Sequence, residues 1–103
     1  MSVPVNDVEN ADIKVHFQKT IGFIRESINQ GGRVLVHCYA GMSRSVTIAV
    51  AYLMQEHQMK MDEALRLIRQ KRPYSEPNPG FMKQLAEFER ELGFKPNALT
   101  FFE

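Results

Sequence analysis

Apolar residues recur at spacings of three and four along four stretches of the chain, and this spacing predicts four amphipathic helices. The expected helices cover residues 12–29, 43–57, 61–72 and 79–92. The apolar positions that define them are Ile13, Phe17, Ile21, Ile24 and Ile28 in the first, Val46, Ala49, Val50, Leu53 and Met54 in the second, Met61, Ala64, Leu65 and Ile68 in the third, and Phe81, Leu85, Phe88 and Leu92 in the fourth.

Residues that favour helix ends stand at the borders of these stretches. Asp12 and Asn78 are the expected N-caps, and Pro79 occupies the first helical position of the last helix. Glycines, which accept positive φ, and one proline are expected to end the helices. These residues are Gly31, Gly32, Pro73 and Gly93.

One short segment has a different pattern. Residues 33–37, Arg-Val-Leu-Val-His, are rich in apolar β-branched residues and follow a glycine turn, which predicts a short buried strand. The expected fold class is therefore α/β, with a short central sheet flanked by about four helices. One domain is expected in residues 1–93, followed by a tail in residues 94–103.

Composition narrows the class of partner. The chain has 103 residues, and 13 Lys and Arg against 12 Asp and Glu give a net charge of +1. This balance gives no electrostatic case for binding nucleic acid or an anionic membrane. No apolar run approaches the roughly 20 residues that span a bilayer, and the N-terminus lacks the pattern of a signal peptide. The protein is therefore expected in the cytoplasm or the nucleus.

The position of the single cysteine, Cys38, predicts a reactive thiol. It follows the predicted strand, and a short loop with Gly41 leads to Arg44 at the start of the second helix. Backbone N–H groups of such a loop and the helix dipole favour an anion, and Arg44 can donate to two oxygens of a phosphate. The same field favours the thiolate of Cys38. The residues thus predict a phosphate cradle with a nucleophile beneath it.

The sequence "HCYAGMSRS" resembles the His-Cys-x5-Arg-Ser/Thr signature of the protein tyrosine phosphatases, in the form found in dual-specificity phosphatases. The resemblance covers residues 3–92, because "AYLM", "EAL", "RP", "PN" with "GF", and "QL" before "FE" follow in the order of that family. It implies a three-layer phosphatase-like fold and a two-step hydrolysis of phosphate monoesters without a metal or other cofactor.

The resemblance also assigns roles to individual residues. It implies that Cys38 is the nucleophile, that Asp7 is the general acid and then the base, and that Ser45 stabilises the leaving thiolate. His37 would orient Cys38, and Asn78 would brace the loop. From the residues alone Asp12 could also be the acid, although it fits better as an N-cap. The positions assigned to phosphate binding are Tyr39, Ala40, Gly41, Met42, Ser43 and Arg44.

The expected substrate is a phosphoprotein carrying phosphotyrosine, phosphoserine or phosphothreonine. A phosphoinositide phosphatase of the same superfamily is the nearer alternative, but the variable loop positions Tyr39, Ala40, Met42 and Ser43 are not basic. A rhodanese-type sulfurtransferase matches the loop poorly. A non-catalytic phosphate-binding relative would normally lack the cysteine, so a weakly active phosphate-binding fragment is an alternative only if Asp7 cannot be positioned.

Chains of the resembled family begin with strands and a helix ahead of the acid loop, whereas this chain begins at "VPVND". We expect either a fragment of a longer phosphatase or two copies that complete one another. In the second case, exposed strand edges would pair into a homo-oligomer.

Overall fold

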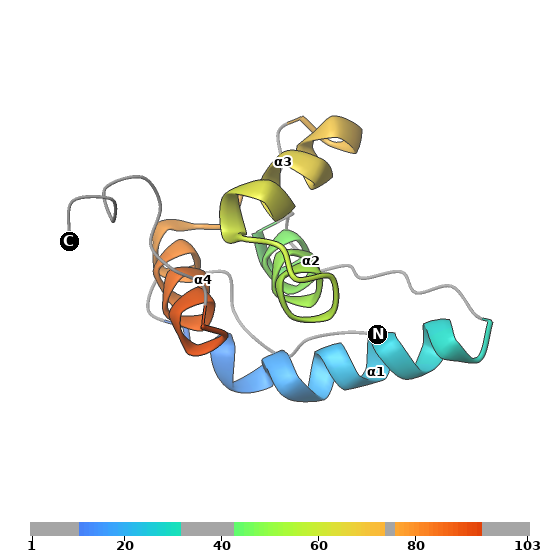
Figure 1. The fold of residues 1–103 in the computed structure, drawn as a ribbon. Helices are drawn as coiled ribbons and strands as arrows, with labels where there is room; N and C mark the ends of the chain where they lie inside the picture. Colours follow the sequence, from blue (N-terminus) through green and yellow to red (C-terminus); the bar gives the residue numbers. More distant parts are fainter. Residues whose placement is uncertain (1–10, 32–42, 74–75, 94–103) are drawn as a thin grey trace.

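The structure is a computed structural model that describes residues 11–31, 43–73 and 76–93. Its regular elements are all helical (Figure 1). They are the 3-10 turn η1 (Lys14–His16) and the α-helices α1 (Phe17–Asn29), α2 (Ser43–Glu56), α3 (Met61–Lys71) and α4 (Pro79–Glu91). The prediction of four amphipathic helices is therefore confirmed, and three of the four begin within a residue of the expected position.

The predicted α/β class is wrong for this part of the chain. The described residues form helices and turns without any strand or sheet, so neither the short central sheet nor the three-layer arrangement is found there. The expected strand, residues 33–37, lies outside the described residues. The reason lies in the packing: a helix, not a sheet, fills the centre of the described structure and receives the apolar faces of the others.

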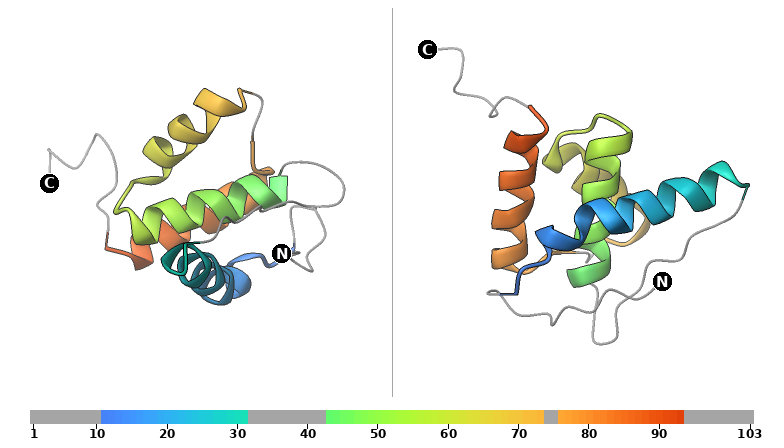
Figure 2. Two further views of the ribbon diagram at one scale, coloured as in Figure 1. Left: turned by 90° about the vertical axis from the view of Figure 1, so that its right-hand side faces the viewer. Right: turned by 90° about the horizontal axis from the view of Figure 1, so that it is seen from below.

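That central helix is α2, which packs against α1, α3 and α4. Figures 1 and 2 show α1 crossing one side of α2, with α3 on the opposite side and α4 alongside. Ile48, Val50 and Ala51 of α2 have no exposed surface. Close by, the rings of Phe17 on α1 and Phe88 on α4 meet edge to face, with centroids 4.9 Å apart. Burial of this kind stabilises a core by about 1.5–3 kcal/mol per large apolar side chain.

The start of the first helix differs from the prediction. Among the described residues, the N-cap of η1 is Ile13 and that of α1 is His16, so the expected cap by Asp12 is wrong. The acceptor comes instead from α4: the backbone N–H groups of Ile13 and Lys14 both donate to Oε1 of Gln84, at 2.9 Å each. Because Gln84 satisfies these N–H groups from across the interface, a local cap is not required.

The other helix ends agree with the sequence. Gly31 and Gly93 adopt φ of +79° and +88° after α1 and α4, a backbone region that favours glycine. Asn78 caps α4 with its side chain, and Pro79 is the first residue of that helix. Gly32 lies outside the described residues. None of the helices in the described ranges combines the length and apolar character that crossing a membrane requires.

Candidate functional site

The first turn of α2 and Asn78 are the parts of the predicted site that the structure describes. Ser43, the first residue of α2, is buried. Its Oγ accepts a hydrogen bond of 2.7 Å from the backbone N–H of Asn78, and its carbonyl oxygen accepts one of 2.6 Å from Oγ1 of Thr47. The end of α2 that follows the predicted phosphate loop is therefore fixed both within the helix and to the segment ahead of α4.

Asn78 forms the other half of this contact. Its backbone N–H holds Ser43, while its side-chain Oδ1 accepts the N–H of Phe81 at 2.8 Å and so caps α4. Pro79 supports the same geometry, because its fixed φ suits the first helical position. Asn78 thus brings the N-termini of α2 and α4 together. This is the geometry that a bracing role requires, and the role itself stays a prediction.

An open hollow of about 650 Å³ lies at this junction of helix ends. The N-terminus of α2 carries partial positive charge, and its first turn, which is described throughout, contains no acidic residue. An anion at this end of the helix is favoured by both features. The residues that line the hollow are Ser43, Glu76, Pro77, Asn78, Pro79 and Met82.

Arg44 and Ser45 follow Ser43 in the first turn of α2, and both side chains are half-buried. The Nε atom of Arg44 is buried. An arginine held in this way at a helix start can present its planar fork to two oxygens of one anion. The structure therefore places the predicted phosphate-binding arginine at the positive end of α2.

The remaining predicted site residues lie outside the described residues. These are Asp7, His37, Cys38, Tyr39, Ala40, Gly41 and Met42. The roles predicted for them, including nucleophile and general acid, stay predictions. Within the described ranges, no three side chains of His, Cys, Asp or Glu gather as metal ligands.

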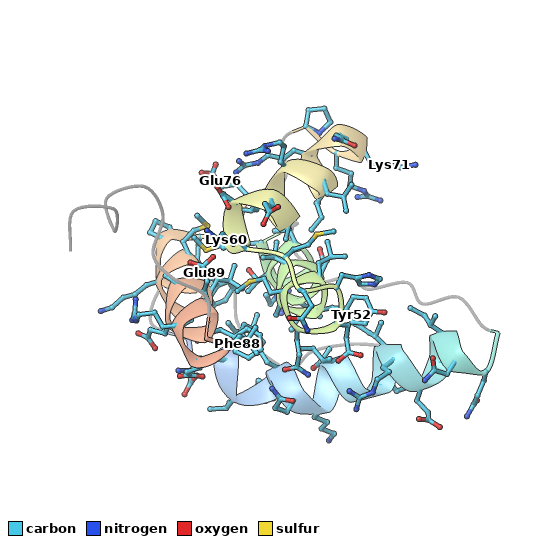
Figure 3. The ribbon with its side chains drawn as sticks, in the orientation of Figure 1. Tyr52, Lys60, Lys71, Glu76, Phe88 and Glu89 are labelled. Atoms are coloured by element: carbon cyan, nitrogen blue, oxygen red, sulfur yellow. The ribbon has the colours of Figure 1, made fainter. Side chains whose placement is uncertain are left out.

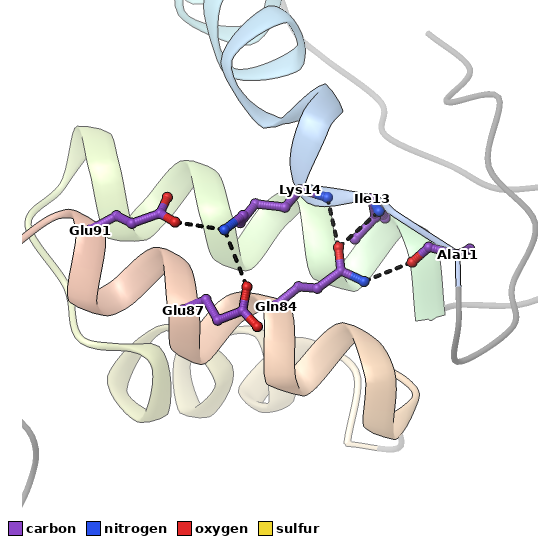
Figure 4. Close-up of polar contacts among 6 residues, drawn as sticks. All are labelled: Ala11, Ile13, Lys14, Gln84, Glu87 and Glu91. Carbon is purple, nitrogen blue, oxygen red and sulfur yellow. Dashed lines mark hydrogen bonds and ion pairs between the residues drawn. The ribbon is translucent and has the colours of Figure 1, made fainter.

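Sequence reasoning missed one residue of this region, Gln84. Besides accepting from Ile13 and Lys14, its Nε2 donates to the carbonyl oxygen of Ala11 at 2.7 Å (Figure 4). A helical pattern assigns such a glutamine to the polar border of an apolar stripe and says nothing of a partner 73 residues away in sequence. The only signal was that "QL" belongs to the segments that carry the family resemblance.

An ion-pair cluster lies beside Gln84. Lys14 Nζ donates to Glu91 at 2.6 Å and to Glu87 at 3.2 Å. The hydrogen bond to Glu91, and then the one to Glu87, raise the pKa of Lys14 above its ordinary value of 10.5. Because these side chains are partly exposed to water, the cluster contributes little to stability.

Comparison with known proteins decides the family. The model of the family described as "Dual specificity phosphatase, catalytic domain" matches residues 1–91. The chain belongs to this family. The resemblance seen in the sequence is thereby confirmed.

Individual dual-specificity phosphatases show the same relationship. The chain is 48% identical over 90 residues to dual specificity protein phosphatase 1B of Arabidopsis thaliana, covering 87% of this chain and 54% of that protein. It is 50% identical over 91 residues to human dual specificity protein phosphatase 2, covering 88% of this chain and 29% of that protein. The crystal structure of human DUSP28 superposes with a TM-score of 0.84 at 36% identity, covering 87% of this chain and 61% of that one. The chain thus spans about half or less of the curated relatives named here.

Proposed function

We propose that this protein is a cysteine-dependent phosphatase that hydrolyses phosphate monoesters of tyrosine and of serine or threonine in phosphoproteins. The observation that carries the proposal is the match of residues 1–91 to the dual specificity phosphatase catalytic domain. The signature residues that such chemistry needs are present in this sequence, with Cys38 and Arg44 separated by a five-residue loop.

The first chemical step transfers the phosphoryl group to the enzyme. The thiolate of Cys38 attacks phosphorus in line with the leaving oxygen, so that an S–P bond forms while the O–P bond breaks. Asp7 donates its proton to the departing phenol or alcohol oxygen. The products of this step are the dephosphorylated protein and a cysteinyl-phosphate.

The second step returns the enzyme to its starting state. Asp7, now a carboxylate, removes a proton from water, and the water oxygen attacks phosphorus. The S–P bond breaks, and the Ser45 hydroxyl stabilises the thiolate that leaves. Inorganic phosphate is released.

The geometry of the described residues supports the binding part of this mechanism. In both steps the transferring phosphoryl group carries negative charge spread over its three equatorial oxygens. Arg44 and the positive end of α2 can supply donors to such oxygens. The hydrogen bond between Ser43 and Asn78 fixes this end of α2 in advance. Donors that are already fixed cost no reorganisation when the charge develops.

The decisive experiment is turnover of an aryl phosphate in the presence of a metal chelator. We expect hydrolysis by the wild type and none by Cys38→Ser, which should still bind phosphate or tungstate because the cradle remains. Arg44→Lys should lower kcat/KM strongly, since a point charge cannot bind two oxygens as the arginine fork does. Arg66→Lys, the same change on the exposed side of α3, is the matched control and should leave turnover unchanged. Undiminished turnover by Cys38→Ser would falsify the mechanism.

The substrate class needs a separate comparison. Phosphotyrosyl and phosphothreonyl peptides should be hydrolysed at higher kcat/KM than phosphoinositides presented in vesicles. The opposite order would contradict the assignment to phosphoproteins while leaving the chemistry intact. Thiosulfate turnover without phosphatase activity would contradict both.

A further inference from the structure

Gln84 holds the backbone ahead of α1 by three hydrogen bonds. Its Oε1 accepts from the N–H groups of Ile13 and Lys14, and its Nε2 donates to the carbonyl oxygen of Ala11. Figure 4 shows this one side chain reaching from α4 to Ala11, Ile13 and Lys14. All three bonds are to backbone groups, so they fix the path of the chain and not merely the position of a side chain.

The same helix also fixes the start of α2. The backbone N–H of Asn78, the N-cap of α4, donates to Ser43 Oγ at 2.7 Å. Asn78 lies six residues before Gln84 in the sequence. Six residues of α-helix span about 9 Å, and a helix of this length is a stiff spacer. Through α4, the segment 11–14 is therefore held at a fixed distance from the helix that begins with Ser43 and Arg44.

The link through α4 matters because each of the two segments that it joins leads to a residue of the proposed mechanism. Asp7, the proposed general acid, lies four residues before Ala11, and four residues reach at most about 14 Å. Cys38, the proposed nucleophile, lies five residues before Ser43. A general acid works only within about 2.6–3.2 Å of the oxygen that it protonates, so the relative placement of these two segments controls the first chemical step.

We propose that Gln84 is a positioning residue for the general acid, holding the chain that carries Asp7 in register with the helix that carries Arg44. The inference rests on the proposed function and adds a residue to it. The neighbouring ion pairs do not act in this way, because Lys14, Glu87 and Glu91 meet through flexible, partly exposed side chains and fix no backbone.

The test compares two phosphate esters that differ in their need for an acid. Phosphotyrosine leaves as a phenol with a pKa of about 10 and needs the proton, whereas dinitrophenolate departs without one. Gln84→Met keeps the length of the side chain and removes all three hydrogen bonds. We expect kcat/KM for phosphotyrosine to fall by about 10- to 100-fold, the effect of a misplacement of about 1 Å, and kcat/KM for dinitrophenyl phosphate to fall by less than about threefold.

Three further measurements separate positioning from a general loss of structure. Glu87→Gln, the matched control on the same helix, should leave both values within about twofold of the wild type. The alkaline fall of kcat/KM for phosphotyrosine, which reports the protonated acid, should flatten in Gln84→Met. In an Asp7→Asn background, Gln84→Met should cost less than about threefold, because residues that act through one another are not additive.

Each result has a definite consequence. Equal losses on both esters, or a full loss that persists in the Asp7→Asn background, would overturn the positioning role while the wild type still supports the proposed function. No turnover of any phosphate ester by the wild type would overturn the proposed function and this inference with it. If Gln84→Met does not fold, Gln84→Glu replaces it: its carboxylate can still accept from Ile13 and Lys14 but cannot donate to the carbonyl oxygen of Ala11. A smaller loss, again selective for phosphotyrosine, is then expected, and an equal loss on both esters would overturn the positioning role.

Discussion

The helices α2 and α3 arise from the same kind of sequence pattern and have opposite places in the molecule. Both show apolar residues at helical spacing. In α2, seven residues are buried and the helix packs against three others, whereas in α3 only Ala64 and Leu65 are buried. Figure 3 shows Lys71 near the end of α3 that projects furthest from the other helices. The periodicity of a sequence thus predicts that a helix forms. The number of neighbouring helices decides how many residues of that helix are buried.

The residues with a proposed role in chemistry lie on the more buried helix, α2, and not on α3. The first turn of α2 carries Ser43, Arg44 and Ser45, and the hydrogen bonds of Ser43 to Asn78 and Thr47 hold it. A site built on a helix that cannot shift keeps its donors in place. The outer face of α3 has no such support, and nothing in the proposed mechanism depends on it.

Core truncation should show the largest contrast between the two helices. Ile48 of α2 is fully buried and Leu67 of α3 is 40% exposed. Ile48→Ala should lower the free energy of unfolding by about 2–5 kcal/mol, because it removes buried methyl groups and leaves a cavity. Leu67→Ala should lower it by about 0.5 kcal/mol or less. Urea unfolding followed by circular dichroism measures both, and similar losses would show that the burial of α2 and α3 does not differ in energy.

The hydrogen bonds that tie each helix start to α4 give the second contrast. Asn78 N–H donates to Ser43 Oγ of α2, and Met61 N–H of α3 donates to Glu89 Oε2 at 2.7 Å. Figure 3 shows Glu89 on the side of α4 that faces the start of α3, near Lys60.

Ser43→Ala should cost about 1–3 kcal/mol of stability, because it leaves the Asn78 N–H without its acceptor beside a buried residue. Glu89→Ala should cost less than about 1 kcal/mol, since Met61 is half-buried and water can accept in place of the carboxylate. Ser43→Ala should also lower kcat/KM for an aryl phosphate, which Glu89→Ala should not. Unfolding and turnover measured on the same samples check this pair, and a larger cost at Glu89 would reverse the comparison.

The elements that local chemistry determines could be predicted from the sequence. The four helices follow from apolar spacing, the start of α4 from Asn78 and Pro79, and the ends of α1 and α4 from Gly31 and Gly93. In each case the cause lies within a few residues of its effect, so a single sequence contains it.

Features that depend on distant partners could not be predicted in this way. Ile48 is fully buried and Leu53 only half-buried, although the expected apolar stripe of α2 included Leu53 and omitted Ile48. The stripe fails because α2 has neighbours on several sides. Asp12 failed as a cap for a related reason: the acceptor comes from Gln84, 71 residues away from Ile13.

For the candidate site, the signature predicted which residues to examine, and the fold added how two of them meet. No local pattern indicates that Ser43 and Asn78 are hydrogen-bonded, since 35 residues separate them. The predicted sheet is not found in the described residues, where the helix α2 is packed against the other three helices. The segment 33–37, on which that prediction rested, lies outside the described residues.

Charge changes on the outer face of α3 should have the smallest effect. Arg66 and Lys71 are exposed there, and Arg69 is half-buried. Arg66→Gln should change the free energy of unfolding by no more than about 0.5 kcal/mol, because substitutions at exposed positions away from caps and cores rarely exceed this. It should also leave kcat/KM for a small aryl phosphate unchanged, since the small substrate requires only the region around α2. A loss of turnover on the aryl phosphate would show that α3 acts on the first turn of α2 through the core, which would remove the distinction between the central and the peripheral helix. A loss confined to phosphoprotein substrates would preserve that distinction and assign the cations of α3 to contacts with the protein part of the substrate.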